Sequence, residues 1–295
     1  MSFYQKSSTL SRRFRLVQAS FLQEDGLAFA KVLPEEQIEK AFADAHADFA
    51  REEGAVYTPA VTLWAFLSQV LFKEEQRSCM AAVSRVLVLL VALGRKPCLK
   101  NTGAYCRARG KLPGPVIRTL ATDVAKGCEQ AVPSEWLWHG RHVHLVDGTT
   151  VSMPDTDANQ DEYPQNVAQK PGLGFPIVRL AVLLSLATAM VQDMALGPYA
   201  GKETGETALF RELLDGVDPQ SIIVADRYYC SYFLIAMAML GRRDFVVRLH
   251  QCRKTDFTTA ERLGEGDYLV TWIRPHRPKW MDHATYEQIP ETMTL

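Results

Sequence analysis

Two segments in which a short apolar run is followed directly by an aspartate constrain the fold of this chain more than any other feature. The first, HVHLVDGTTVSMPDT (residues 142–156), alternates apolar and polar residues as far as Val146, which is the pattern of a half-buried β-strand. Asp147 and Gly148 follow, and then a second β-rich run. We therefore expect a break in the strand at Asp147. An acid at such a break is either a turn residue, because Asp-Gly is common in hairpins, or a functional group.

The second segment, SIIVADRYYCSYF (residues 221–233), has the same design. Its continuous apolar run, residues 222–225, is typical of a central parallel strand that is covered on both faces. Asp226 ends this run, and apolar residues then recur at helical spacing. Asp226 is thus either a helix N-cap or a site residue at the edge of an α/β sheet. Two strands that each present an aspartate can bring the carboxylates together to hold a divalent metal.

The rest of the C-terminal half completes an α/β pattern. We expect strands at residues 177–187, 191–196 and 244–249 and a helix at residues 205–214. The order is then three strands, a helix, a strand, a helix and a strand, with the acids on the first and fourth strands. That is the order of a ribonuclease-H-like mixed sheet, in which these two strands are neighbours at the centre.

An acidic segment, residues 155–166, separates the first two strands and contains no Lys or Arg. It is polar and rich in turn-forming residues, so we expect a loop close to the two aspartates. Asp155 or Asp157 could approach a metal there. The alternative is that both are solvated loop acids.

Residues 1–139 read as a helical domain, because apolar residues recur at spacings of three and four in residues 35–50, 60–72 and 81–93. Residues 95–126 that follow are strongly basic, with Asp123 as their single acid. This charge is either a solvated face or a surface that tracks DNA phosphates. The candidate DNA contacts in it are Lys100, Arg107, Arg109 and Lys111.

The composition excludes several classes of protein. With 295 residues, 47% of them hydrophobic, the chain can bury a substantial core, and a net charge of −1 excludes a uniformly basic nucleic-acid binder. The six cysteines form no CxxC pair, and we find no signal peptide and no membrane-spanning run, so we expect a cytoplasmic protein with reduced thiols. GPYAGK (residues 197–202) is one residue short of a phosphate loop, and no GxSxG motif occurs.

Several segments together resemble the transposases of bacterial insertion sequences that use an Asp-Asp-Glu triad and carry a β-strand insertion domain. They are HLVDGTTVSMPDT, GLGFPIVRLAVLLSL, GKETGETALFRELL and IIVADRYYCSYF, together with LWAFLSQVL and NTGAYCRAR in the helical part. The resemblance implies metal-dependent cleavage and strand transfer of DNA. It places catalytic, metal-binding roles on Asp147 and Asp226, with Mg²⁺ as the metal and Mn²⁺ as a substitute.

The third acid of that family, a Glu in a Tyr-Arg-Glu-Lys signature on a late helix, has no counterpart in this sequence. The resemblance therefore implies an incomplete ribonuclease-H-like core at residues 140–250, and only the beginning of the β insertion at residues 251–295. In this last segment we expect β-type runs at residues 268–273 and 284–289 without pairing strands, so that the segment is either poorly ordered or prone to association. Arg248, Arg253 and Lys254 are either contacts to the DNA end or solubilising surface residues.

The implied partners are double-stranded DNA, as terminal inverted repeats and as target, and a second copy of the chain on that DNA. The implied location is the nucleoid of a bacterial cytoplasm, with no membrane partner. Because the third acid is missing, we expect impaired strand transfer by this chain alone. Two alternatives stay open: a non-catalytic product that binds DNA or a full-length partner, and an unrelated nuclease with two acids.

Overall fold

The computed structural model describes residues 32–71, 74–92, 94, 96–251 and 255–295 of the chain. The chain forms two compact units, Met1–Val124 and Ala125–Leu295. The division falls inside helix α7 (Gly114–Gln130). The domain limits that we expect at residues 139 and 250 stay predictions.

The N-terminal unit is helical where it is described, as the sequence predicts. The apolar stripes of its helices meet in two clusters, one around Phe42 and Trp64 and the other around Val86 and Tyr105. Tyr105 and Phe42 are fully buried. The helices are α3 (Glu35–Asp44), α4 (Pro59–Leu71), α5 (Cys79–Ala92), α6 (Gly103–Arg109) and the first part of α7. None of the helices in the described ranges is both long enough and apolar enough to cross a membrane.

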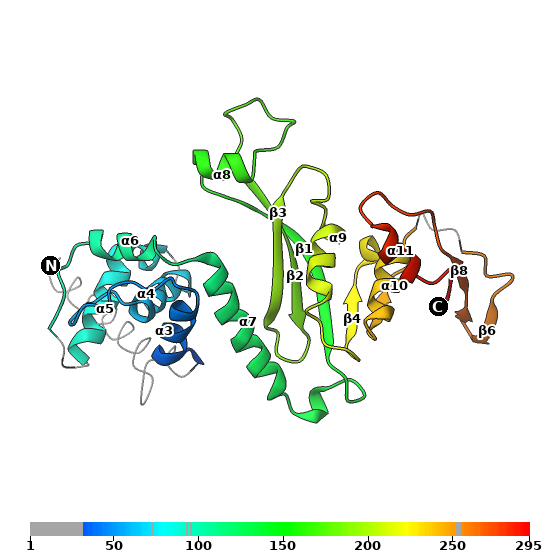
Figure 1. Ribbon diagram of the computed structural model, residues 1–295, viewed down its shortest axis with the longest axis horizontal. Helices are drawn as coiled ribbons and strands as arrows, with labels where there is room; N and C mark the ends of the chain where they lie inside the picture. Colours follow the sequence, from blue (N-terminus) through cyan, green and yellow to red (C-terminus); the bar gives the residue numbers. More distant parts are fainter. Residues whose placement is uncertain (1–31, 72–73, 93, 95, 252–254) are drawn as a thin grey trace, which may run out of the picture. The chain divides into compact units, whose positions relative to one another are not determined.

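The C-terminal unit is an α/β structure built on a five-stranded mixed sheet (Figure 1). Its order is β3-β2-β1-β4-β5, so the first and fourth strands are neighbours at the centre, as predicted. The pairs β1–β2 and β2–β3 are antiparallel, whereas β1–β4 and β4–β5 are parallel. The strands are β1 (Val143–Ser152), β2 (Ile177–Ser185), β3 (Val191–Pro198), β4 (Ile222–Ala225) and β5 (Asp244–Val247).

Strand β1 runs through Asp147 without interruption, so the predicted break is wrong. Antiparallel pairing with β2 continues past it, with Asp147 opposite Val182, and ends at Ser152. The long partner strand supplies this pairing, which the Asp-Gly sequence alone did not reveal. Strand β4 is much shorter, and its last pair with β1 is Val146 with Ala225. Beyond Val146, no strand in the described ranges pairs with β1 on the β4 side, and we call this stretch the open edge of β1.

Two helices pack on the sheet and enclose the main core of this unit. They are α9 (Glu206–Leu214) and α10 (Tyr232–Leu240). Phe210 and Leu213 of α9 are fully buried with Ile223 of β4. Burying one such side chain contributes about 1.5–3 kcal/mol. These contacts hold α9 on the sheet, where it packs mainly on β2 and β3 and also reaches β1.

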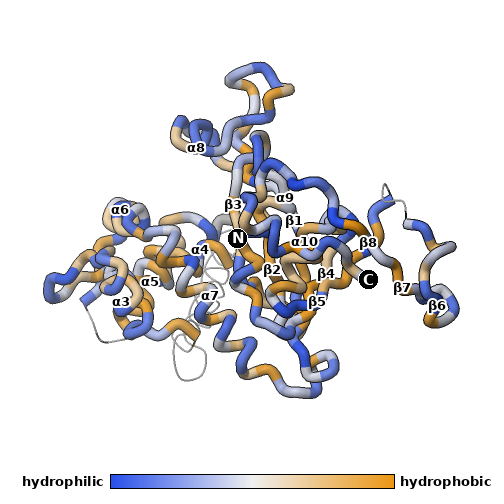
Figure 2. The backbone as a smooth tube through the Cα atoms, turned by 45° about the vertical axis from the view of Figure 1, so that its right-hand side comes forward, coloured by the Kyte–Doolittle hydropathy of each residue, from blue (hydrophilic) through white to orange (hydrophobic). Residues whose placement is uncertain are grey.

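The acidic segment between β1 and β2 differs from its prediction as a loop. It contains a short helix, α8 (Asp157–Glu162), which begins where Thr156 Oγ1 accepts a hydrogen bond from Asn159 N at 3.2 Å. This is an ordinary N-cap, and the segment lacked the apolar periodicity that would have predicted a helix. Figure 2 shows that the backbone around α8 is mainly hydrophilic, in contrast to the central strands.

The C-terminal segment also differs from its prediction. The run expected as β at residues 284–289 is mostly helix α11 (His283–Gln288), capped by Asp282 Oδ1, which accepts from Thr285 N at 2.8 Å. The remaining elements are two antiparallel strand pairs. One is the hairpin of β6 (Glu261–Gly264) with β7 (Asp267–Leu269), and the other is β8 (Thr271–Ile273) with β9 (Thr292–Thr294), between which α11 lies in the chain.

This segment has pairing partners and is packed, contrary to our expectation. Met281, Ile289 and Met293 are buried against α10, where they contact the cluster of Tyr232 and Phe233. Apolar surface of α10 is thus covered by residues that follow β5 in the chain. The sequence analysis missed this because the three residues are scattered between polar positions rather than periodic.

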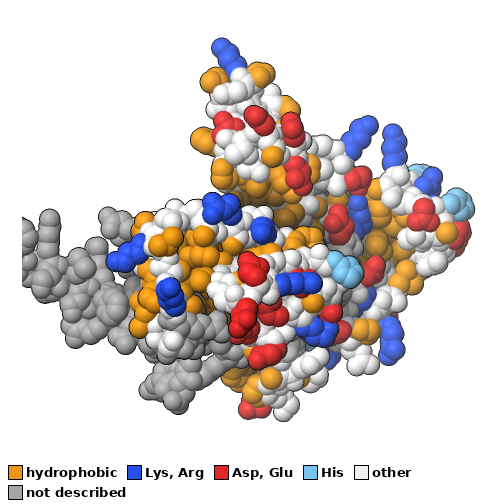
Figure 3. Space-filling view, turned by 60° about the vertical axis from the view of Figure 1, so that its left-hand side comes forward, with side chains coloured by type: hydrophobic (Ala, Val, Ile, Leu, Met, Phe, Trp, Pro, Cys, Tyr) orange, Lys and Arg blue, Asp and Glu red, His pale blue; other side chains and the backbone are white. Residues whose placement is uncertain are grey.

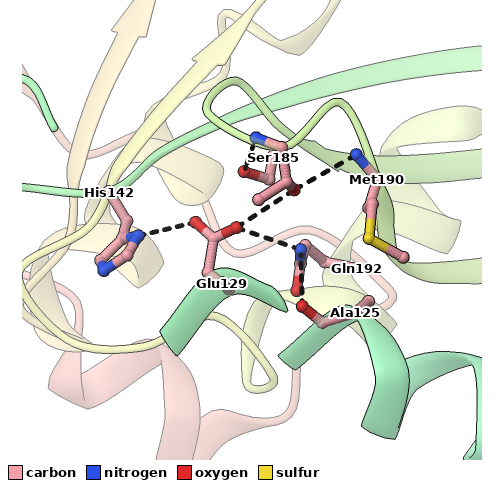
Figure 4. A network of polar contacts seen from close by, with 7 residues as sticks. Ala125, Glu129, His142, Ser185, Met190 and Gln192 are labelled. Atoms are coloured by element: carbon pink, nitrogen blue, oxygen red, sulfur yellow. Dashed lines mark hydrogen bonds and ion pairs between the residues drawn. The ribbon is translucent and has the colours of Figure 1, made fainter. Parts of the chain in front are cut away.

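A polar network fixes the beginning of β1 (Figure 4). Glu129, at the end of α7, accepts from His142 Nδ1 at 2.6 Å when that nitrogen carries the proton. Its other oxygen, Oε2, accepts from Gln192 Nε2 at 3.3 Å and from Thr188 Oγ1 at 3.4 Å. Glu129 is 8% exposed, and a buried carboxylate needs such partners. The network therefore ties the end of α7 to β3, to the β2–β3 turn and to the residue before β1.

His144, the second residue of β1, is buried beside this network and its Nδ1 has no hydrogen-bond partner among the described residues. Burial is the main cause that lowers the pKa of His144 below its usual 6.5, and nearby His142 lowers it further. Glu129 and Asp218 act in the opposite direction. The folded chain thus favours the neutral form of His144.

The pKa of His144 predicts a loss of stability in acid. Between pH 6.5 and the lower folded pKa, the unfolded chain binds more protons than the folded chain, so the free energy of unfolding falls as the pH falls. We expect His144→Leu to show a smaller difference between urea midpoints at pH 7.5 and pH 5 than the wild type. His276→Gln, at an exposed histidine, should keep the wild-type difference. An unchanged difference in His144→Leu would contradict the assignment.

Candidate active site

Asp147 and Asp226 lie side by side in the chain's central strand pair. The last paired residues of β1 and β4 are Val146 and Ala225. Asp147 is the next residue of β1, and Asp226 is the first residue after β4. Because the strands are parallel and in register, the alternation of side chains places both aspartates on the same face of the sheet. Both side chains are exposed to solvent.

Each aspartate uses one carboxylate oxygen for a local hydrogen bond. Asp147 Oδ1 accepts from Gly148 N at 2.9 Å. Asp226 Oδ1 accepts from Tyr228 N at 2.8 Å and thereby caps the short 3-10 helix η3 (Arg227–Tyr229). Asp226 is therefore an N-cap, but of this short turn and not of the longer helix that we expected to begin there, since α10 begins at Tyr232 after Ser231. The cap occupies a single carboxylate oxygen. Neither Oδ2 atom receives a hydrogen bond from a residue that the structure describes, so each remains available to a ligand.

A third carboxylate, Glu206, lies close to this pair and was missed by the sequence analysis. It is the first residue of α9, and its side chain lies over Gly148: a Cβ atom added at Gly148 would overlap Glu206 Cγ, Cδ and Oε2. Burial is the main cause that raises the pKa of Glu206, and the charges of Asp147 and Asp226 raise it further. Nearby Arg179 acts in the opposite direction.

The buried hydroxyl of Tyr229 stands beside the same three acids. Tyr229 is fully buried, and its ring packs edge to face against the Phe210 ring, with the ring centres 5.7 Å apart. Its hydroxyl has no hydrogen-bond partner among the described residues. The pKa of Tyr229 is raised, first by burial and then by Glu206, Asp147 and Asp226 in that order. An unpaired buried donor next to three carboxylates is unusual for a purely structural position.

Arg179 of β2 supplies positive charge near Glu206. Its Nη1 donates to Thr204 O at 2.9 Å, and its guanidinium lies 4.9 Å from the centre of the Tyr199 ring. These contacts hold Arg179 by the loop that precedes α9. The side chain is therefore placed to offset part of the negative charge of the acids.

The chemistry of these side chains suits a hard divalent cation such as Mg²⁺, which prefers carboxylate oxygens. The room left by Gly148 and the unpaired hydroxyl of Tyr229 also fit a site that gains a ligand. In the described ranges, however, no three His, Cys, Asp or Glu side chains are already arranged to enclose a metal. Binding would require the carboxylates to draw together.

The two loop acids considered from the sequence have other contacts. Asp155 Oδ1 accepts from Gln160 Nε2 at 2.7 Å, and Asp157 is the first residue of α8. Neither is among the charges that shift the pKa of Glu206 or of Tyr229. The structure thus brings Asp147, Asp226 and Glu206 together, and leaves Asp155 and Asp157 with the acidic segment.

The predicted DNA contacts fall into three groups. Lys100, Arg107, Lys111 and, after β5, Arg248 are exposed. Arg109 instead has internal partners, since its Nη1 lies 3.3 Å from Gln69 Oε1 and its guanidinium lies 5.9 Å from the centre of the Tyr105 ring. Arg253 and Lys254 lie outside the described residues. On the face drawn in Figure 3, Lys and Arg side chains are spread singly among hydrophobic and acidic ones.

The comparison with protein families decides the family of this chain. The profile of the transposase DDE domain matches residues 138–293, which is more than half of the chain. The chain belongs to the DDE transposase family. The matched residues include both aspartates, Glu206 and the packed C-terminal segment up to β9.

Two individual proteins are similar to this chain. One is named Putative transposase InsZ, from Escherichia coli (strain K12), and is 24% identical over 135 residues, or 45% of this chain. The chain spans 44% of the length of that relative. The other is the piggyBac transposase in a cryo-EM structure of its synaptic complex with hairpin DNA, with 11% identity and a TM-score of 0.36, over 92% of this chain and 63% of that one. The second likeness is too weak to align individual residues.

The unpaired Tyr229 hydroxyl gives a prediction on the stability of this transposase-family chain. A buried hydroxyl without a partner costs about 1–3 kcal/mol, so Tyr229→Phe should raise the free energy of unfolding by about 1 kcal/mol in metal-free urea titrations. The matched control is Tyr232→Phe, because the Tyr232 hydroxyl donates to Pro290 O at 2.8 Å and its loss should cost about 1 kcal/mol. Equal losses in both variants would show that the Tyr229 hydroxyl has a partner.

Proposed function

We propose that this chain carries the catalytic aspartates of a DNA transposase of an insertion sequence, in which Asp147 and Asp226 together hold Mg²⁺ for DNA cleavage and strand transfer. The observation that carries the proposal is the register of β1 and β4, which places two exposed carboxylates side by side at the centre of the sheet. Membership of the DDE transposase family supports the same assignment.

The chain's own residues would prepare the site before DNA arrives. The backbone N–H groups of Gly148 and Tyr228 orient one oxygen of each aspartate, which leaves the second oxygen for the metal. A bound divalent metal would stabilise charge that develops on the transferred phosphate. Because both side chains are exposed where the β1–β4 pairing ends, a DNA backbone can approach them.

Helix α6 and the residues around it would bind the DNA backbone. Lys100, Arg107 and Lys111 are exposed and can contact phosphates without reading the base sequence. Arg248 follows β5 in the same unit as the aspartates and is a candidate contact to the DNA end. Arg253 and Lys254 remain candidates from the sequence alone. We further propose that two copies of the chain act on paired terminal repeats.

The catalytic proposal is tested with labelled duplex that carries the terminal repeat of the element encoding this chain, in Mg²⁺ or Mn²⁺. Asp147→Asn and Asp226→Asn should each lower the cleavage rate at least about a thousandfold, because each removes charge that holds the metal. Asp155→Asn, at the acid bonded to Gln160, is the control and should cleave at the wild-type rate.

Two outcomes would contradict this proposal. Cleavage that survives both substitutions would place the reaction at other residues. A wild-type chain that binds the duplex but cuts no faster than Asp147→Asn would favour the alternative function, in which the chain binds DNA or a full-length partner without cutting.

The DNA-binding surface gives a separate prediction. In the triple variant Lys100→Gln, Arg107→Gln and Lys111→Gln, the slope of log affinity against log salt should become less steep by about 0.9 for each phosphate that is no longer neutralised. Lys40→Gln, at an exposed lysine of α3, should leave the slope unchanged. Arg109→Gln should mainly lower the thermal stability, since the half-buried Arg109 contacts Gln69 and the Tyr105 ring. An unchanged slope in the triple variant would assign these residues to solubility.

A further inference from the structure

We propose that Glu206 supplies a third carboxylate to the metal site of Asp147 and Asp226. This inference rests on the proposed function and deepens it, because it assigns a ligand within the described chain. The evidence is the position of Glu206 over Gly148, the open edge of β1 at that level, and the unpaired hydroxyl of Tyr229.

Gly148 provides the space that Glu206 occupies. With any larger residue at position 148, the Cβ atom would overlap the Glu206 side chain. The glycine is therefore needed here for a close approach of a side chain and not for a turn, because β1 continues through it. The glycine that follows Asp147 is thus explained by the Glu206 side chain that lies over it.

The open edge of β1 lets the three carboxylates approach one another. Alternation along β1 directs Asp147 to one face of the sheet, whereas Gly148 and the Glu206 side chain over it lie on the other. Strand β4 would separate the two faces, but its pairing ends at Val146 with Ala225. Past this pair, no β4 backbone lies between the two faces, so side chains from both faces can approach one another beside β1. The electrostatic effect of both aspartates on Glu206 agrees with this proximity.

A helix-stabilising role alone does not explain this arrangement. An acid in the first turn of a helix interacts favourably with the helix dipole, and Glu206 has that position in α9. Such an acid needs no other carboxylates around it to interact with the dipole. Glu206 instead lies partly buried near two aspartates, where like charges repel unless a cation intervenes.

Tyr229 is the second, independent observation that points to a ligand. Its fully buried hydroxyl has no partner in the described part of the chain, and its electrostatic neighbours are Glu206, Asp147 and Asp226. A donor at this place can bind a carboxylate oxygen or a water of a hydrated cation. The site therefore combines carboxylate oxygens with a free donor.

The direct test is the affinity of the full chain for Mn²⁺, measured from the EPR signal of free Mn²⁺ during titration without DNA. We expect Glu206→Gln to weaken Mn²⁺ binding at least about tenfold, because loss of a ligand should cost no less than loss of a residue that orients one. Glu212→Gln, at an exposed glutamate on the same helix, is the matched control and should bind as the wild type.

A second variant tests the geometry without removing a carboxylate. Gly148→Ala should displace the Glu206 side chain and weaken Mn²⁺ binding to a similar degree. The double variant Gly148→Ala with Glu206→Gln should then bind no more weakly than Glu206→Gln alone, since both changes remove the same ligand. Far-UV circular dichroism and thermal unfolding confirm that each variant is folded.

The outcomes separate the two proposals. If Asp147→Asn and Asp226→Asn lose Mn²⁺ binding while Glu206→Gln and Gly148→Ala retain wild-type affinity, the inference on Glu206 is wrong and the proposed function stands. If all of these variants bind like the wild type, or if the wild type binds no Mn²⁺ at millimolar concentration, both are wrong. Weakened binding in Glu206→Gln and Gly148→Ala, with an unaffected Glu212→Gln, supports the inference.

Discussion

The parallel pairing of β1 with β4 is the interaction on which the rest of the candidate site depends. It fixes Asp147 and Asp226 at the same level and on the same face. Its early end at Ala225 also leaves the neighbouring stretch of β1 open on one side. A longer β4 would cover this edge with backbone, and a shift of one residue would turn one of the aspartates to the opposite face.

The core beneath the sheet determines where Glu206 lies. Phe210 and Leu213 of α9 are buried against the sheet, and Ile223 of β4 belongs to the same cluster. Because these residues fix α9 beside β1, its first residue is held over Gly148. Tyr229 belongs to the same core, in which its ring contacts Phe210, and its hydroxyl lies near the three acids. A well-packed core thus supports a polar arrangement that is costly by itself, which is common at functional sites.

The sequence predicted the central pair of strands because apolar runs that end in an acid are strong local signals. Glu206 could not be found in the same way, since its approach to Gly148 depends on how α9 packs across two other strands. The continuous course of β1 was hidden because its partner strand is distant in sequence. Helix α11 had a readable signal in Asp282 and Thr285, the pattern of an N-cap, which the β-type residues around it obscured. Arg109 was grouped with surface residues because its charge gave no sign of its partner Gln69.

The claim at the centre of this account is that one metal site joins β1 and β4. A crystal of the chain soaked in Mn²⁺ and measured at the manganese absorption edge locates the metal directly. The account predicts an anomalous peak about 2.1 Å from a carboxylate oxygen of both Asp147 and Asp226. A peak bound to other residues, with these two carboxylates apart and without metal, would contradict it.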